Sequence, residues 1–190
     1  MALGGIDIGT TGCKMTVYEE DGTYLSTFSS AYPFSRSAGI HFFDAGIIIE
    51  AVVDVLQKAI LEIPTLHAIG ISSFGEAFVL LDQEDQILYP TLLNTDPRGI
   101  GEVEDFVRSC KKERICAITG ASPHSMFSVA KILWVKKHEP QIWARVRKLL
   151  LIEDFVVYKL TGVRQVDYAL IIHSCKTTFI QINSFLKRFW

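Results

Sequence analysis

The chain has 190 residues, of which 49% are hydrophobic and 21% are charged, and its formal net charge is −2. This composition is typical of a globular protein that buries a sizeable core, and it excludes a disordered chain. The small negative charge and the lack of any long Lys/Arg run argue against nucleic acid or an anionic membrane as a partner.

The N-terminal segment and the cysteines favour a cytoplasmic protein. The first seven residues contain no basic side chain and end in Asp7, which is unlike a signal peptide. No apolar stretch approaches the ~18 residues that a membrane span needs. The cysteines form neither a CxxC pair nor a metal-ligand spacing, so we expect reduced thiols. They are Cys13, Cys110, Cys116 and Cys175.

The first thirty residues predict three short strands joined by tight turns. The strands are expected at residues 4–9, 13–19 and 23–30. In the second strand, the alternation of polar and apolar residues turns Met15 and Val17 inward. Asp21-Gly22 fits the turn between the second and third strands, because Asp-Gly tolerates the positive φ of hairpin turns.

A helix is expected next, over residues 45–62, with Asp44 as its N-cap and Pro64 just beyond its end. Strand-like or apolar segments follow at 66–72, 78–82 and 90–95, and helices at 101–110, 128–138, 140–146 and 153–160. This order predicts an α/β fold, a mixed sheet with a strand meander and flanking helices. It resembles the ribonuclease-H-like domain shared by actin, Hsp70 and sugar kinases.

The Gly-Thr-Thr-Gly turn between the first two strands has the residues of a phosphate-binding hairpin. Its glycines let the backbone turn tightly and approach a ligand closely. Its threonines offer hydroxyls and amides to phosphate oxygens, a lysine adds positive charge, and an aspartate could hold Mg²⁺ through water. An ordinary hairpin with Thr-rich edges stays open as an alternative. The predicted cofactor-binding residues are Asp7, Gly9, Thr10, Thr11 and Lys14, with Asp7 also the metal residue.

Residues 71–82, Ile-Ser-Ser-Phe-Gly-Glu-Ala-Phe-Val-Leu-Leu-Asp, resemble a segment of the FGGY carbohydrate kinases, as do residues 89–98, Tyr-Pro-Thr-Leu-Leu-Asn-Thr-Asp-Pro-Arg. In that family the first segment carries a polar residue into the sugar pocket, and Glu76 occupies its position. The residue there is usually His in xylulose kinases and Glu in glycerol kinases. Asn94 stands where the family typically has Trp, so the identity of the sugar stays open.

A polyol needs several convergent polar groups, and a carboxylate accepts from two adjacent hydroxyls while Asn or Arg completes the network. Two alternatives stay open: Glu76 as a surface loop carboxylate, and Asp96-Pro-Arg98 as a structural turn with a local ion pair. Residues 118–134 resemble the family's Thr-Gly…Lys-x-x-Trp region, where the loop before a helix contributes to the pocket wall. The expected substrate-binding residues are Glu76, Asn94, Asp96, Arg98 and Met126.

The other residues of that region are weaker candidates for substrate binding. His124 is the second candidate for the pocket wall, but a lone histidine more often satisfies a turn. Lys131 and Trp134 lie three residues apart on one helix face, and we expect them to pack and position, not to react. An Hsp70- or actin-like nucleotide switch would share the phosphate hairpin but not these sugar-side segments.

The resemblance covers residues 4 to about 170, and it implies an FGGY kinase N-terminal domain at 1–170. It also implies ATP and Mg²⁺ as cofactors and transfer of the ATP γ-phosphate to a hydroxyl of a small-molecule sugar, most like xylulose. Residues 171–190 contain no Asp or Glu and depart from the family pattern, so we expect a divergent, frameshifted or truncated tail.

The family's catalytic base lies in a Gly-x-x-Asp segment, and its ATP-binding C-terminal domain follows; both are expected beyond residue 190. We therefore expect the isolated chain to lack kinase activity. The alternative is a non-catalytic sugar- or phosphate-binding remnant, which could self-associate through the face that the second domain normally covers.

Overall fold

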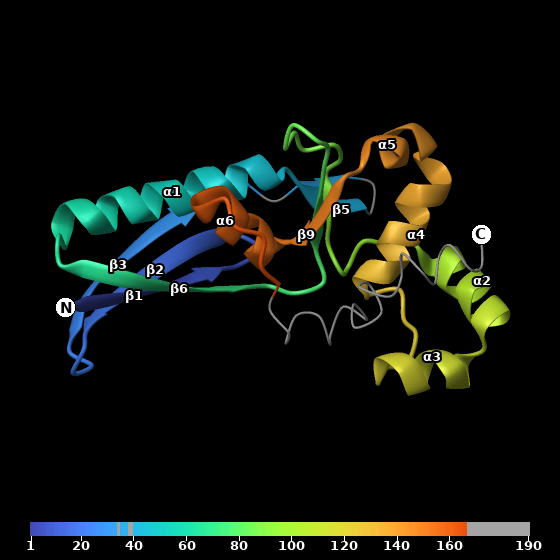
Figure 1. Ribbon diagram of the computed structural model, residues 1–190, viewed down its shortest axis with the longest axis horizontal. Helices are drawn as coiled ribbons and strands as arrows, with labels where there is room; N and C mark the ends of the chain where they lie inside the picture. Colours follow the sequence, from blue (N-terminus) through green and yellow to red (C-terminus); the bar gives the residue numbers. More distant parts are fainter. Residues whose placement is uncertain (34, 38–39, 167–190) are drawn as a thin grey trace. The chain divides into compact units, whose positions relative to one another are not determined.

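A computed structural model describes residues 1–33, 35–37 and 40–166, which form two compact units (Figure 1). The first unit comprises Met1–Ser35, Phe43–Phe74 and Ile152–Gln165, and the second comprises Arg36–Phe42 and Gly75–Leu151. The tail expected at 171–190 lies outside the described residues.

The first unit is built on a four-stranded mixed sheet in the order β3-β2-β1-β6. Its strands are β1 (Ala2–Ile8), β2 (Gly12–Glu19), β3 (Tyr24–Ala31) and β6 (Leu66–Ser73). The first three form an antiparallel meander, and β6 runs parallel to β1. Gly22 has φ 88° in the turn between β2 and β3, as its sequence predicts. The predicted mixed sheet with a meander is confirmed.

Helix α1 (Ala45–Glu62) lies along one face of this sheet, against β2 and β3, and α6 (Ile152–Thr161) contacts β6 and α1 (Figure 1). Asp44 caps α1 because its Oδ1 accepts from the amide of Gly46 at 2.8 Å. Met15 and Val17 are fully buried, as the alternation of β2 predicts. The predicted bounds of α1 are confirmed. In the described part of the chain, no helix has the length and hydropathy needed to cross a membrane.

The second unit contains short strands, some of which the sequence did not reveal. A three-stranded sheet joins β4 (Ser35–Ser37), β5 (Ile40–Phe43) and β8 (Thr91–Leu92), and a two-stranded antiparallel pair joins β7 (Phe78–Leu81) to β9 (Lys148–Leu151). Segments of two to four residues are too short to show a periodicity, which is why β4, β5 and β9 were not predicted.

The helices of this unit are α2 (Ile100–Cys110), α3 (Lys112–Thr119), α4 (Ser128–His138) and α5 (Pro140–Arg145). All but α3 were predicted, α4 with both ends correct. The core joins α4 to β7, β8 and β9 through Phe78, Leu80, Leu92, Ile132, Val135 and Leu151. Gly99 precedes α2 with φ 92°, and a Cβ there would lie 2.5 Å from the carbonyl oxygen of Ala130. A glycine is therefore required for α2 to approach α4 this closely.

Candidate functional site

The turn between β1 and β2 is closed by a hydrogen bond from the amide of Gly9 to the carbonyl of Gly12, at 2.9 Å. Neither glycine has a positive φ, so neither is needed for a left-handed backbone conformation. The glycines instead allow neighbouring backbone atoms to come close. A Cβ at Gly12 would lie 3.0 Å from the carbonyl oxygen of Ser30 on β3. Thr10 and Thr11 stand exposed at the tip.

Two charged residues flank this turn on the sheet. Asp7 and Lys14 are directly opposite each other in the β1–β2 register, and both are exposed. Their neighbours Ile6 and Ile8 are buried, so the two charges lie on the sheet face opposite that core. The turn and the two charges therefore occupy the same end of one sheet, which is the arrangement that the sequence predicted.

The turn fits a phosphate group. Within the described residues, the amides and hydroxyls of Thr10 and Thr11 donate to no protein acceptor. These donors, with the ammonium of Lys14, match the needs of phosphate oxygens. The described residues contain no group of three or more His, Cys, Asp or Glu able to hold a metal. A Mg²⁺ ion at Asp7 would thus complete its shell with phosphate and water, as Mg²⁺ commonly does.

In the second unit, Glu76 is buried at 7% exposure, which is contrary to the surface-carboxylate alternative. Its Oε2 accepts from the amide of Ser128 at 2.7 Å and from the hydroxyl of Ser128 at 3.1 Å. Ser128 is the first residue of α4, and its N-cap Phe127 has an apolar side chain. Glu76 therefore caps α4 from a distant loop, where a negative charge is favourable. Its φ of 59° is a strained value for a residue with a side chain.

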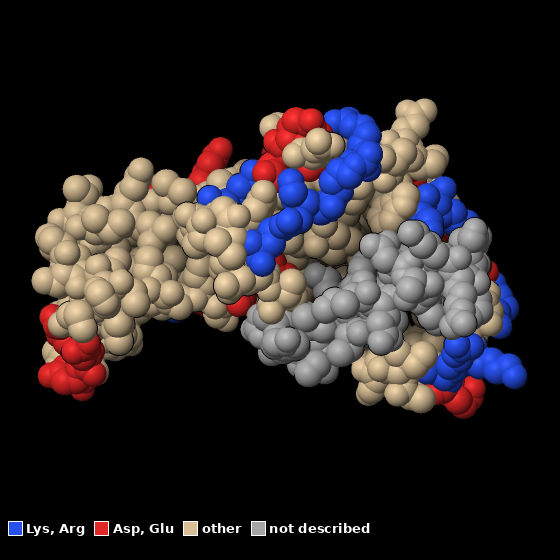
Figure 2. Space-filling model, in the orientation of Figure 1, with Lys and Arg blue, Asp and Glu red and all other residues tan. Residues whose placement is uncertain are grey.

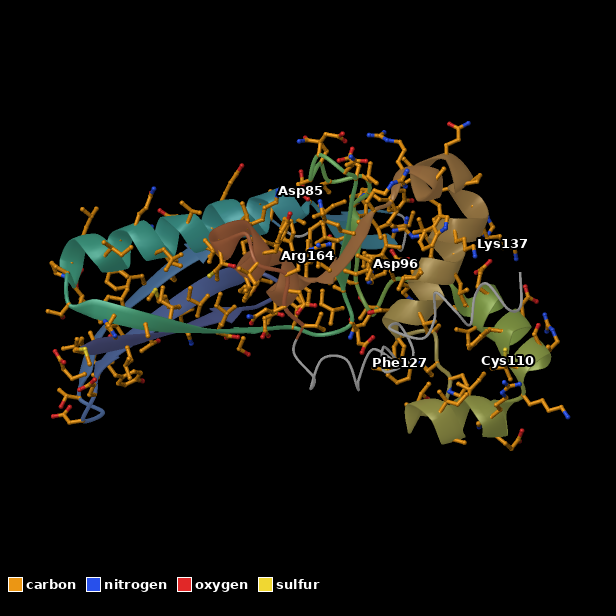
Figure 3. All side chains as sticks on the ribbon, in the orientation of Figure 1. Asp85, Asp96, Cys110, Phe127, Lys137 and Arg164 are labelled. Carbon is orange, nitrogen blue, oxygen red and sulfur yellow. The ribbon has the colours of Figure 1, made fainter. Side chains whose placement is uncertain are left out.

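Asp96, labelled in Figure 3, accepts hydrogen bonds that organise the turn that carries it. Its Oδ1 accepts from the amide and Nε of Arg98 at 2.9 and 2.8 Å, and its Oδ2 accepts from Nη2 of Arg98 at 2.7 Å. Oδ2 also accepts from the amide of His41 on β5, at 3.0 Å. Burial alone would raise the pKa of Asp96, but the hydrogen bonds from Arg98 and His41 outweigh it and lower that pKa.

The local ion pair foreseen for Asp96-Pro-Arg98 is thus present, and protein donors engage both oxygens of Asp96. Arg98 also lies over the ring of Trp134, 5.2 Å from its centre, and its Nη1 donates to the Tyr89 hydroxyl at 3.3 Å. These contacts make Asp96 and Arg98 organisers of the segment that carries Asn94, whose side chain is exposed.

The loop before α4 places Met126 at the surface, and Met126 donates its amide to Nδ1 of His124 at 3.0 Å. His124 therefore satisfies a turn, which is the role we favoured for it. Lys131 is fully buried, and its Nζ donates to the carbonyl of Ser125 in the same loop. Burial lowers the pKa of Lys131 to about 8, against the opposing charge of Asp96. Lys131 thus ties this loop to α4.

The sequence matches the FGGY family of carbohydrate kinases, N-terminal domain, over residues 2–183. The chain belongs to the FGGY family of carbohydrate kinases. Its two compact units, with the mixed sheet of the first, have the ribonuclease-H-like fold that this family's structures share.

Individual carbohydrate kinases resemble this chain in sequence and in structure. The chain is 31% identical over 161 residues to a xylulose kinase of Staphylococcus xylosus, covering 83% of this chain and 33% of that protein. It is 24% identical over 169 residues to a gluconokinase of Bacillus subtilis, covering 87% and 33%. A crystal structure of a xyloylose kinase from Brucella ovis matches with a TM-score of 0.85 and 27% identity, over 92% of this chain and 37% of that one. The chain thus spans about a third of the length of its FGGY relatives.

The site residues predicted from the sequence fall into two sets. Those of the phosphate turn all belong to the first unit, and those of the sugar side all belong to the second. Three residues that contact these sets were not foreseen: Tyr32 beside the turn, His41 at Asp96, and Ser128 at Glu76. His41 and Asp96 are 55 residues apart, and nothing in either local pattern indicates that they meet.

Proposed function

We propose that this chain supplies the phosphate-binding and sugar-binding residues of an ATP-dependent carbohydrate kinase that transfers the γ-phosphate to a hydroxyl of a xylulose-like sugar. The observation that carries the proposal is the β1–β2 turn, where Thr10 and Thr11 expose donors beside Lys14 and Asp7. Family membership supports a carbohydrate as the phosphate acceptor.

In this proposal each residue of the turn has a defined part. The amides and hydroxyls of Thr10 and Thr11 bind phosphate oxygens, and Lys14 balances their charge. Asp7 would hold Mg²⁺ through water, and the ion would supply positive charge to the phosphates. Positioning and charge stabilisation are most of what phosphoryl transfer asks of a protein.

On the sugar side we assign Glu76, Asn94 and Met126 to the wall of the sugar site. Asn94 and Met126 have accessible side chains, which supports direct contact. Glu76 brings a carboxylate to the start of α4, beside the loop that carries Met126. Asp96 and Arg98 contribute indirectly, because their ion pair holds the turn next to Asn94. Xylulose is our preferred substrate because two xylulose kinases are 31% and 30% identical to this chain, whereas the gluconokinase is 24% identical.

We further propose that a polypeptide of these 190 residues alone transfers phosphate at a negligible rate. In the family resemblance, the base that takes the proton from the attacking hydroxyl belongs to a Gly-x-x-Asp segment, and none of the residues assigned above takes that part. Without a positioned base and a closed site, binding of sugar and nucleotide does not lead to reaction.

A thermal-shift screen tests the proposal. The chain is heated with xylulose, ribulose, gluconate or glycerol, each with and without MgATP, because a ligand that binds the folded state raises the melting temperature. We expect xylulose to give the largest rise and Glu76→Ala to abolish it. Ser128→Ala is the matched control, since it removes one partner of the same cap but keeps the carboxylate. No shift with any of these sugars contradicts the proposal.

A second candidate is a non-catalytic remnant that self-associates. Three neighbouring apolar residues of the first sheet support it, Leu3, Tyr18 and Tyr24, which are 42%, 43% and 57% exposed. They lie side by side in the strand register, on the face that also carries Asp7. An exposed apolar patch of this kind promotes association. Sedimentation velocity decides: concentration-dependent dimers without any ligand-induced thermal shift favour the remnant.

Surface charge bears on the remaining partners. In Figure 2, basic side chains of the second unit lie beside acidic ones, in keeping with the ion pairs Arg145–Asp82 and Lys148–Asp85. Because the chain also has a formal net charge of −2, we propose neither nucleic acid nor a membrane as a partner. The free thiols of Cys13, Cys110 and Cys116 support a reducing compartment such as the cytoplasm.

A further inference from the structure

Tyr32 holds the phosphate turn from the neighbouring strand. It directly follows β3, and its side chain is only 6% exposed. The Tyr32 hydroxyl donates to the carbonyl of Gly9, and the Tyr32 amide donates to the carbonyl of Thr11 at 3.2 Å. One residue thus binds the turn at two carbonyls, one on each side of Thr10.

The bond to Gly9 has a consequence for Thr10. The carbonyl of Gly9 and the amide of Thr10 belong to one planar trans peptide group, in which C=O and N–H point in opposite directions. Fixing the Gly9 carbonyl toward the Tyr32 hydroxyl therefore fixes the Thr10 amide away from it. That amide is one of the donors that no described protein group engages.

The protonation state of Tyr32 suits this task. Burial raises the pKa of the Tyr32 phenol above its ordinary value, and the negative charges of Asp7 and of an ionised Cys13 thiol raise it further. The hydroxyl therefore remains a donor throughout the neutral and mildly alkaline range. A buried phenylalanine would fill the same space, so the hydroxyl needs a reason beyond packing.

We propose that Tyr32 is a positioning residue of the phosphate turn: its hydroxyl orients the Gly9–Thr10 peptide so that the Thr10 amide is directed to a bound phosphate. This inference rests on the proposed function, because it assumes that the turn binds phosphate. It adds a residue outside the turn, and outside its sequence motif, to the binding machinery. Preorganised donors of this kind bind better than donors that must be ordered by the ligand.

Tyr32→Phe tests the inference, with Tyr24→Phe as the matched control. Tyr24 stands in the same strand, is 57% exposed and contacts Tyr18 edge-on, so its hydroxyl has no part at the turn. The full 190-residue chain, labelled with ¹⁵N, is titrated with magnesium pyrophosphate well below the melting temperature. We expect Tyr32→Phe to raise the dissociation constant by about three- to tenfold, the worth of one hydrogen bond.

The outcomes separate the two claims. Wild-type affinity in Tyr32→Phe, or an equal loss in Tyr24→Phe, overturns the role of Tyr32 and leaves the phosphate site standing. If pyrophosphate shifts no signal of the wild-type turn, the phosphate site itself fails, and the inference falls with it. Unchanged signals of α1 in Tyr32→Phe show that a weaker affinity does not come from a damaged fold.

Discussion

Glu76 and Ser128 are 52 residues apart in the chain, yet one carboxylate oxygen of Glu76 accepts from both the amide and the hydroxyl of Ser128. The cap and the sugar-side carboxylate are therefore one group. A residue expected to bind substrate also fixes the start of the helix that follows the loop carrying Met126.

Replacing Glu76 should consequently cost stability as well as binding. Glu76→Ala removes a charged cap, and we expect it to lower the free energy of unfolding by about 1–3 kcal/mol. Ser128→Ala removes only the hydroxyl bond, so its cost should be smaller, about 1 kcal/mol. Urea denaturation followed by circular dichroism measures both. Equal stability of Glu76→Ala and the wild type would show that Glu76 does not cap α4.

Two glycines of one helix should respond to alanine in opposite directions. At Gly99, φ is 92° and a Cβ would lie 2.5 Å from a backbone oxygen, so Gly99→Ala should destabilise by about 2 kcal/mol or more. At Gly101 nothing lies within 4 Å of the added carbon, and Gly101→Ala should stabilise by up to about 1 kcal/mol. Melting temperatures of the two variants check this. A gain in stability from Gly99→Ala would contradict the close contact of α2 with α4.

Lys131 predicts a pH dependence of known sign. Burial lowers its pKa to about 8 from an ordinary 10.5. Between these pH values the unfolded chain keeps a proton that the folded chain has released, so this group makes stability rise with pH. The opposite trend comes from Cys13, whose pKa burial raises to about 11 from 9.0. Only a comparison of variants therefore isolates Lys131.

Lys131→Met is the variant to compare, with Lys112→Met at an exposed position as the control. Between pH 8 and pH 10.5, Lys131 should raise the unfolding free energy of the wild type by about 1–3 kcal/mol. Lys131→Met should lack this contribution. Lys112→Met should follow the wild-type profile. Urea titrations at several pH values measure the difference. Parallel profiles for Lys131→Met and the wild type would mean that burial does not lower the pKa of Lys131 in the folded chain.

The thiols should differ in reactivity. Burial and the charge of Asp7 raise the pKa of Cys13, and burial also raises the pKa of Cys110. Cys116 is only partly buried. Because the thiolate is the reacting form, iodoacetamide at pH 8 should modify Cys116 well before Cys13 or Cys110. Peptide mapping by mass spectrometry gives the order, and early labelling of Cys13 would contradict the described packing of β2.

The parts of the fold that the sequence predicted are those with a local signal. Helix α1 has an N-cap, an apolar stripe and a following proline, and its ends were predicted correctly. The hairpin at Asp21-Gly22 depends on two adjacent residues. By contrast, β5 and β9 are four residues long, and each pairs with a strand far away in the chain, β8 and β7 respectively. A segment of this length shows no periodicity that would predict it.

The same distinction applies to the site. The residues of the phosphate turn are contiguous or nearly so, and their exposure follows from strand alternation at Asp7 and Lys14. The burial of Glu76 and its hydrogen bonds to Ser128 could not be predicted, because both depend on a helix that begins 52 residues later. The second hydrogen-bond partner of Asp96, the amide of His41, is equally remote.

The most direct test of the central claim is a titration of the ¹⁵N-labelled chain with D-xylulose, followed by amide chemical shifts. We expect saturable shifts that centre on Glu76, Asn94, Met126 and Ser128, and much smaller ones with sucrose as a control. Shifts scattered over the surface, or equal responses to both sugars, would contradict the assignment of a sugar site to these residues.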